Sequence, residues 1–423
     1  MSVAPEVSGS LEGKTSPMIV RNFLQWAKNA PSAHRAEGAG ALARAYLYTD
    51  LDEKGRRDAE IALMSLLDDP SPLVRRALAD NFASAADAPH SLIAALANDQ
   101  SDIAGPVLSR SPLLSEAELI DCAAIGDAFA QTAIALRARV PLSVSAALAE
   151  VGAREAAISL AVNPGAELAE FSMRRMVERF GDDGEMREAL LSRPHLPGAV
   201  RAELVAAAAA SLTSFVVGCA WLSPERAERL SREARDKAHV IIVADTASRQ
   251  GRDGLRALAK HLRVSDQLTP SLVLRALLCG RRDLFEAALA ELSGVREDRV
   301  AGQIRDFRGA GFAALYAKAG LPAKFLPAFR AALEAQRAFG DREMREGDEA
   351  RLSLAMIKRV LSACESFNRG ELDRLLALLR RFEVEAALEE ARAEAPLLAL
   401  PAEEETASLI DMSALEAALD AAA

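Results

Sequence analysis

Apolar residues recur every three or four positions within successive short segments of this chain, and this spacing constrains the fold more than any other feature. Leu73, Ala77 and Leu78 form one such stripe. A spacing of three to four places side chains on one face of an α-helix, whereas a half-buried strand requires strict alternation. A short helix with one apolar face has no core of its own and must pack against its neighbours. The sequence therefore predicts an all-α fold of stacked helices.

The composition favours the same fold class. Apolar residues make up 50% of the 423 residues, but aromatic residues only 4%. Alanine is the commonest apolar type, and it combines high helix propensity with a side chain small enough for close helix packing. Sheets usually contain more β-branched and aromatic residues. The chain is also too long for one compact core, so we expect several domains or one elongated array.

Helix starts are marked by a recurring pair, a hydroxyl residue followed by proline. The hydroxyl oxygen can accept from free backbone N–H groups, and proline has no N–H to leave unsatisfied at the first helical position. The pairs are Ser16-Pro17, Ser71-Pro72, Ser111-Pro112, Ser223-Pro224 and Thr269-Pro270. Candidate capping boxes are Thr49 with Asp52 and Ser115 with Glu118, and candidate C-terminal stops are Gly280, Gly294 and Gly320.

Between about residues 60 and 205, turn-like breaks divide the chain at a pitch that suits two short helices per unit. The breaks are Asp69-Pro70, Asp99-Gln100, Gly126-Asp127, Asn163-Pro164 and Pro194-His195, at intervals of 30, 27, 37 and 31 residues. Units of this size bury their apolar faces only by stacking on one another. The rhythm therefore predicts helical repeats.

Residues 68–79, which read DDPSPLVRRALA, resemble the turn and second-helix start of a HEAT repeat. Residues 46–312 as a whole, with this stretch and the later runs LSRSPLL and AVNPGAEL, resemble the bacterial family called domain of unknown function 2336. The resemblance implies an α-α superhelix of HEAT-like repeats. It implies no established activity and offers no catalytic motif, so no functional residue is transferred from it.

These signals predict four regions, which we place at 1–17, a disordered N-terminus; 18–222, HEAT-like helical repeats; 223–382, a second helical lobe; and 383–423, an acidic, largely disordered tail. The tail contains eleven acidic residues and one basic residue, so it carries the whole net charge of −10. Within it, a short amphipathic helix is predicted by apolar residues at spacings of three, three and four, namely Leu409, Met412, Leu415 and Leu419.

The cysteines and the N-terminus indicate a cytoplasmic protein. Residues 1–17 have neither the basic nor the apolar region of a secretory signal. The cysteines stand far apart in apolar or helical contexts, which predicts buried reduced thiols rather than disulfides or a metal site. They are Cys122, Cys219, Cys279 and Cys364.

Residues 204–224 contain no charged side chain and are long enough to cross a bilayer. Five consecutive alanines lower the hydrophobicity of this stretch, and Gly218 and Pro224 interrupt it. We therefore predict a buried helix and no membrane span.

Motifs for nucleotide or RNA binding are incomplete. Gly13-Lys14-Thr15 matches only the end of a phosphate loop, because Ser8 stands where the first glycine is required. Residues 251–254, Gly-Arg-Asp-Gly, could mimic the clamp of a KH module, but that fold needs flanking strands. The nearby run 240–243 fits a turn of buried helix as well as a strand, so we favour an ordinary interhelical turn.

The histidines lack the spacing of a zinc site and are predicted to lie in turns or on the surface. They are His34, His90, His195, His239 and His261. No nucleophile motif accompanies them. We therefore predict no catalytic residue, no cofactor and no metal site, and a protein that is not an enzyme.

Stacked repeats form long curved surfaces that suit protein partners or peptide segments. We therefore predict a non-enzymatic protein-interaction scaffold or regulatory adaptor. Its partner would be another protein or an acidic peptide segment, and the chain's own acidic tail could compete for the same surface. The predicted partner-binding contacts are Arg75, Arg76, Arg174 and Arg175.

The alternative is a HEAT-like nucleic-acid-acting enzyme of the DNA glycosylase type, which would need a basic concave face with aromatic residues around a carboxylate. The chain before residue 383 is balanced in charge, and Trp26 and Trp221 lie outside the arginine clusters, so nucleic-acid binding is not favoured. The arginines could also simply cover outer helix faces and pair with nearby Glu170 and Glu178. Self-assembly into a homo-oligomer through an exposed end repeat is a third hypothesis.

Overall fold

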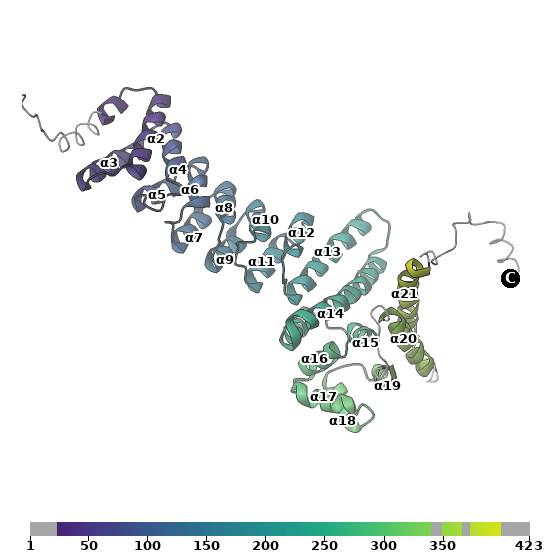
Figure 1. Ribbon diagram of the computed structural model, residues 1–423. Coiled ribbons are helices and arrows are strands. Elements are labelled where there is room, and N and C mark those ends of the chain that lie inside the picture. The colour runs from purple at the N-terminus through teal and green to yellow at the C-terminus, as the bar shows by residue number, and fades with distance from the viewer. Residues whose placement is uncertain (1–22, 340–348, 366–372, 399–423) are drawn as a thin grey trace, which may run out of the picture. The chain divides into compact units, whose positions relative to one another are not determined.

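The computed structural model describes residues 23–339, 349–365 and 373–398, which form helices and no strands (Figure 1). The all-α fold class is therefore confirmed for these residues. Predictions for residues 1–17, for Ser16-Pro17 and for the amphipathic segment 409–419 lie outside them. The contacts divide the chain into two units, Met1–Pro224 and Glu225–Ala423, and the sequence places the corresponding change at residue 222.

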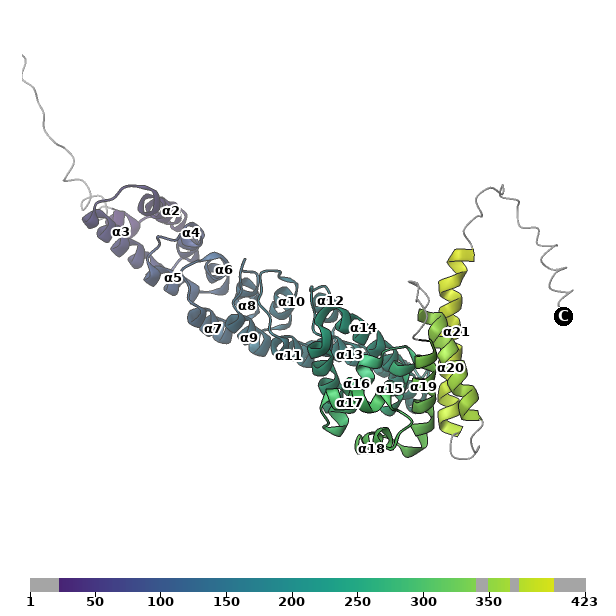
Figure 2. The same ribbon diagram turned by 60° about the horizontal axis from the view of Figure 1, so that its bottom comes forward.

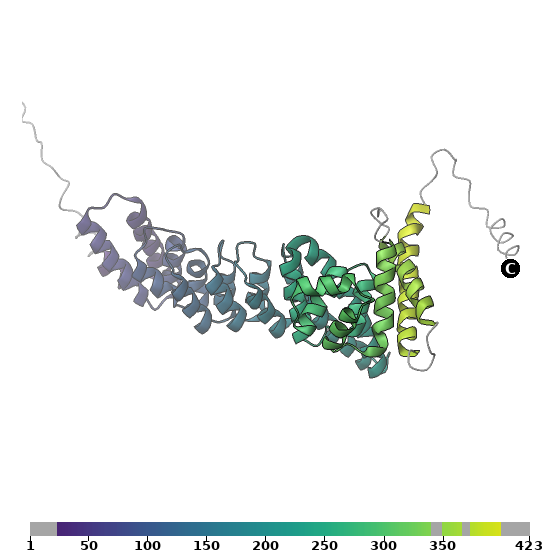
Figure 3. The same ribbon diagram turned by 90° about the horizontal axis from the view of Figure 1, so that it is seen from below.

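In the first unit, helices alternate between two rows, as Figures 1, 2 and 3 show from three directions. The even row contains α2 (Ser32–Tyr48), α4 (Pro72–Phe82), α6 (Ser101–Arg110), α8 (Ala128–Ala135), α10 (Arg154–Val162) and α12 (Gly184–Leu191). The odd row contains α3 (Glu53–Ser65), α5 (His90–Ala97), α7 (Glu116–Ile125), α9 (Leu142–Val151), α11 (Glu170–Phe180) and α13 (Gly198–Gly218). The short 3-10 helix η1 (Leu66–Asp68) follows α3. Each even helix contacts the next even helix, and α7, α9, α11 and α13 contact one another in the same order.

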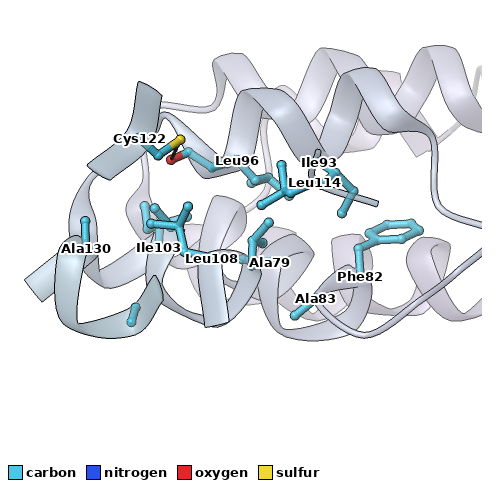
Figure 4. Close-up of a cluster of buried hydrophobic side chains, with 14 of the residues drawn as sticks. Ala79, Phe82, Ala83, Ile93, Leu96, Ile103, Leu108, Leu114, Cys122 and Ala130 are labelled. Atoms are coloured by element: carbon cyan, nitrogen blue, oxygen red, sulfur yellow. Dashed lines mark hydrogen bonds between the residues drawn. The ribbon is translucent and has the colours of Figure 1, made fainter. Parts of the chain in front are cut away.

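The core of the first unit lies between these two rows. Figure 4 shows part of it, where Phe82 and Leu108 of the even row lie opposite Ile93 and Leu96 of the odd row. All four side chains are fully buried. Because each helix supplies only one apolar face, the core continues from helix to helix along the stack instead of closing around one centre.

The turns before α4, α6 and α12 are each held by an arginine from the preceding even helix. Arg35 Nε donates to Asp69 Oδ2 over 2.7 Å, and Arg75 Nε donates to Asp99 Oδ2 over 2.6 Å. Arg154 of α10 makes the same contact with Asp183, which precedes α12. The aspartates that the sequence reads as turn residues therefore also connect successive repeats.

The C-terminal ends of α8 and α10 are capped from the following repeat. Asn163, just after α10, donates Nδ2 to the carbonyl oxygens of Ala135 and Arg137 over 2.7 and 2.8 Å. Arg193, just after α12, donates to the carbonyl of Ala161 in the same way over 3.0 Å. These contacts satisfy carbonyl groups that a helix end leaves without an intrahelical partner.

Three of the predicted hydroxyl-proline pairs begin helices, at α4, α14 and α15. Ser111-Pro112 does not, because Ser111 lies in a loop and its hydroxyl accepts from the backbone of Leu113. The capping box at Ser115 is confirmed, with Glu118 donating its backbone N–H to the serine and accepting from the serine backbone. The box predicted at Thr49 is wrong, since Asp52 is the residue that caps α3.

The predicted repeat breaks mark two different kinds of turn. Asp69, Asp99 and Gly126-Asp127 precede even helices, whereas Asn163-Pro164 and Pro194-His195 precede odd helices. From α4 onward the even helices instead begin after residues that recur every 26 to 30 positions: Ser71, Gln100, Asp127, Ala153 and Asp183. The apparent interval of 37 residues arose because Ala153 carries no turn signal.

Helix α13 is the one described helix that is long and apolar enough to cross a membrane, a criterion of length and composition alone. Its most apolar window has a mean hydropathy of 1.5, but only 17% of that window is buried. The buried residues lie in its first two turns, up to Leu204, while Leu212 and Phe215 are exposed. The prediction of a buried helix is therefore right only for the start of α13.

The second unit begins with α14 (Pro224–Val264), which bends at Gly251, where φ is +64°. The run 240–243 is helical and the turn at Gly251 joins two helical segments, so this part has no KH-like strands. The remaining elements are α15 (Pro270–Leu278), α16 (Arg282–Ser293), α17 (Glu297–Arg305), α18 (Ala310–Lys318), η2 (Ala323–Phe325), α19 (Leu326–Phe339), α20 (Glu349–Glu365) and α21 (Asp373–Leu398). The predicted glycine stops are confirmed, because Gly280, Gly294 and Gly320 all have positive φ after helix ends.

An aromatic cluster forms the centre of the second unit. Phe285 stacks on Phe329 with ring centroids 5.7 Å apart, and Tyr316 meets Phe329 edge to face at 5.3 Å. The Tyr316 hydroxyl donates to the carbonyl of Pro322 over 3.0 Å, which satisfies its polar end. These few rings join α16, α18 and α19 in a chain that is otherwise poor in aromatic residues.

Two predictions about side-chain burial are wrong in part. His239 and His261 are buried, at 1% and 8% exposure, because α14 turns both toward the interior of the second unit. Cys219 is exposed at the end of α13 and Cys279 is half-buried, while Cys122 and Cys364 are buried as predicted.

Candidate functional site

The predicted contacts Arg75 and Arg76 lie on α4, in the even row. Arg75 is held between helices, because it pairs with Asp99 and its side chain is only 14% exposed. Hydrogen bonding to Asp99 raises the pKa of Arg75. Arg76 is more open, and it pairs with Asp80 one turn along at 3.0 Å. Arg75 therefore supports the turn before α6, and Arg76 is the member of this pair that reaches the surface.

Arg174 and Arg175 lie on α11, in the odd row. Arg174 Nε is 2.7 Å from Glu203 Oε1. Arg175 is shared by Glu150 at 2.8 Å and Glu178 at 2.7 Å, and these hydrogen bonds raise its pKa. The structure therefore brings each arginine to its own carboxylates, and the two pairs lie in different rows of helices. Their role in partner binding stays a prediction.

The sequence reading missed a row of exposed apolar side chains along one edge of the first unit. This is the edge where the even helices end and the odd helices begin, and we call it the turn edge. Its exposed fractions run from 46% to 62% for Leu136, Leu142, Val162, Phe171 and Leu191. Leu136, Val162 and Leu191 stand at the ends of α8, α10 and α12, so the same position in three repeats is apolar and open. The signal that could have revealed it is an apolar residue at each helix end, where a polar one is usual.

The second unit contains a buried polar group that the sequence reading also missed. Asp236 and His239 lie one turn apart on α14, at 4% and 1% exposure. Burial raises the pKa of Asp236 to about 6, against the opposing effect of a hydrogen bond from Ser271. Burial lowers the pKa of His239 to about 4, and neither ring nitrogen has a hydrogen-bond partner in the described part of the chain. The apolar run that follows His239 was the available sign that this face of α14 is internal.

Arg275 on α15 connects this region to α21. Its Nη1 is 2.7 Å from Glu385 Oε2, and its guanidinium lies 4.1 Å from the ring centroid of Phe382. Its charge also acts on Asp236 and lowers the pKa of that carboxyl, although burial has the larger effect. Asp236 and His239 are enclosed rather than open to a ligand, so we regard this group as part of the packing of the second unit.

Hollows in the second unit are lined by charges of both signs. One of about 370 Å³, between α14, α16 and α17, is lined by Arg256 and Arg296 together with Glu291, Glu297 and Asp298. None of the described residues that line it is aromatic. Among the residues that the structure describes, no group of three or more His, Cys, Asp or Glu side chains could hold a metal ion.

The two tryptophans of the nucleic-acid hypothesis lie at the surface of the first unit. Trp26 is 44% exposed and packs on Phe23, with ring centroids 5.7 Å apart. Trp221 is 68% exposed and meets Phe215 edge to face at 5.5 Å. Among the residues that the structure describes, the ring contacts of both tryptophans are with phenylalanines and not with the arginines on α4 or α11.

The family described as "Uncharacterised protein conserved in bacteria (DUF2336)" has a model that matches residues 103–369. The match begins and ends further along the chain than the resemblance noted over residues 46–312. A search of curated proteins finds no match. A search of solved structures finds no match either.

Proposed function

Because the chain belongs to the bacterial family DUF2336, whose members are described as uncharacterised, we propose its function from its own surface. It is a non-enzymatic scaffold or regulatory adaptor of the cytoplasm that binds another protein or an acidic peptide segment. The support is the stack of the first unit, in which successive helices of each row pack on one another and expose a long side. Long exposed sides of this kind suit extended partners.

As part of this proposal, the two rows of the first unit form a HEAT-like α-α superhelix. From α4 to α12 the even helices begin at intervals of 26 to 30 residues, and each helix of the even row packs on the next. The arginine contacts at Asp69, Asp99 and Asp183 repeat along the stack. A regular rotation between such units produces a curved surface.

The turn edge is the observation that carries the proposal. A soluble surface normally scatters single apolar residues, whereas contiguous apolar side chains mark interaction sites. Leu136, Val162 and Leu191 occupy the same position in successive repeats and are all more than half exposed. A partner that lies along this edge would bury them together.

The odd-row arginines adjoin this edge. Phe171 lies one turn before Arg174 and Arg175 on α11, so the three side chains share a face. The carboxylates that hold Arg175, Glu150 and Glu178, are themselves more than half exposed. Exposed ion pairs are weak, so an acidic partner segment can exchange with these carboxylates at small cost. Arg174 and Arg175 would then add charge selectivity beside an apolar contact.

Affinity capture with the full chain tests the proposal. We would compare the unaltered protein with a double variant, Val162→Glu with Leu191→Glu, and with a control, Ile61→Glu, which alters an exposed apolar residue on α3. We expect specific proteins captured by the unaltered chain and by the control, and lost with the double variant. Captured proteins would then be purified and their affinities measured.

Equal capture by all three proteins would refute the turn edge as the binding surface. If no captured protein binds the chain when both are purified, the scaffold function is refuted. Matching circular dichroism spectra and melting curves would show that the double variant is folded.

A further inference from the structure

Helices α14 and α21 of the second unit are bridged by ion pairs but do not close on each other. Arg381 Nη1 lies 3.0 Å from Glu233 Oε1, and Lys237 Nζ lies 3.4 Å from Glu385 Oε1. Between these bridges lies a hollow of about 580 Å³. This volume lies within the range of about 300–1,000 Å³ that is usual for ligand-binding clefts in proteins.

Apolar side chains from both helices face this hollow or adjoin it. Val384 and Leu388, one turn apart on α21, line it and are 62% and 53% exposed. On α14, Leu230 and Ile241 are 45% and 60% exposed and lie on the face that carries Lys237, at helical spacing. The helices that the structure describes therefore leave these apolar side chains of α14 and α21 uncovered.

Positive charge predominates at the rim. The charged residues that line the hollow are Lys237, Arg275, Arg380 and Arg381 on the basic side and Glu233 and Glu385 on the acidic side. An occupant with apolar side chains on one face and acidic side chains beside them would suit both the floor and the rim.

The chain itself contains such a segment directly after α21. Residues 399–423 contain six acidic residues and no basic residue. Four apolar residues of this segment recur at spacings of three, three and four, namely Leu409, Met412, Leu415 and Leu419. We propose that residues 409–419 fold back as a helix and place this apolar face in the hollow between α14 and α21.

The segment is long enough to reach the hollow. Leu388 lies ten residues before the end of α21 at Leu398, which is about 15 Å at 1.5 Å per helical residue. Residues 399–408 can span up to about 33 Å when extended. A helix over 409–419 is about 16 Å long, which equals about three turns of α21.

Docking of this segment covers the exposed apolar side chains of α14 and α21 and brings the acidic residues of the segment beside Arg380 and Arg381. A separate helix could enter the hollow only by displacing it, so the C-terminus acts as a built-in competitor. This inference concerns the second unit alone and does not depend on the function proposed for the first.

Disulfide cross-linking in the full chain tests the proposal. The exposed native thiol is first removed with Cys219→Ser, and the test pair is Val384→Cys with Met412→Cys. The control pair keeps Met412→Cys and adds Val264→Cys, because Val264 is an equally exposed valine of the same unit, outside the hollow. A disulfide requires the two Cα atoms to come within about 7 Å. Under mild oxidation at low protein concentration, we expect the test pair to close within one chain at least about tenfold faster than the control pair.

A further substitution, Leu415→Glu, should slow closure of the test pair about tenfold, because it places a charge on the docked face. High salt should slow closure as well, since it screens the contacts with the basic rim. Equal closure rates for the test and control pairs, no closure at all, or cross-linking only between two chains would each overturn the proposal. Cross-linking between chains would assign the hollow to a second copy instead.

Discussion

Replacing Asp236 by asparagine should stabilise the second unit at neutral pH, because the folded chain buries a carboxylate there. Burial raises the pKa of Asp236 from 3.8 to about 6. Each pKa unit corresponds to about 1.4 kcal/mol, so burial of the ionised form costs about 3 kcal/mol above pH 6. Asparagine keeps the acceptor for the Ser271 hydroxyl and carries no charge.

The sign of the pH dependence follows from the direction of the pKa change. A carboxyl whose pKa is raised by folding contributes most stability below its unfolded pKa, near pH 3.8, and loses that contribution as the pH rises through about 6. The charged groups near Asp236 are Arg232, Arg235 and Arg275, and their attraction lowers its pKa without offsetting burial. Asp236→Asn should therefore raise the free energy of unfolding of the second unit by about 3 kcal/mol over that of the unaltered protein at pH 7.5, and change it little at pH 4.

Hydrogen exchange of the amides in α14 and α15 measures this change in the full chain. Both tryptophans, Trp26 and Trp221, belong to the first unit, so their fluorescence during urea unfolding serves as an internal control that should not change. The matched variant is Asp253→Asn, because Asp253 lies on α14 with a side chain that is 91% exposed. We expect Asp253→Asn to change the free energy of unfolding by less than about 0.5 kcal/mol. The reasoning fails if Asp236→Asn is not stabilising at pH 7.5, or if its gain at pH 4 is equally large.

Three other predictions test single contacts. Because burial lowers the pKa of His239, the protein should lose stability as the pH falls from 6.5 through about 4, and His239→Leu should remove this loss. Melting temperatures of the variant from pH 4 to pH 8 should therefore depend less on pH than those of the unaltered protein. An unchanged pH profile would contradict the lowered pKa of His239. Arg75→Met should lower the free energy of unfolding by about 2 kcal/mol, because it leaves the half-buried Asp99 without its cation. Arg76→Met, at an exposed ion pair, should lower it by less than about 1 kcal/mol. Urea unfolding followed by tryptophan fluorescence measures both values, and equal losses would argue against the difference in burial. A maleimide should label the exposed Cys219 first in the native protein. Cys364 is buried, and burial raises its pKa to about 11, so early labelling of Cys364 would show that the second unit opens readily.

Local structure was the part of this protein that could be predicted from neighbours in the chain. A capping box at Ser115 or a left-handed glycine at Gly294 depends on backbone groups within four residues, so the sequence contains all the partners involved. The same reasoning failed at Ser111, where a loop contact was available instead, and at Ala153, where a helix begins without a capping side chain. The all-α class followed from apolar spacing alone.

Long-range pairing was decided only by the tertiary structure. Nothing near Arg75 in sequence predicts that Asp99 is its partner, and Arg175 reaches Glu150 across two helices rather than only its neighbour Glu178. The turn edge likewise appears only when α8, α10 and α12 are aligned in one row, and the burial of Asp236, with Ser271 of α15 hydrogen-bonded to it, exists only in the folded second unit. The amino-acid sequence specifies which short segments become helices, since those hydrogen bonds are local. Which charges meet and which apolar faces stay open depends on how the helices stack, and that is a property of the folded chain.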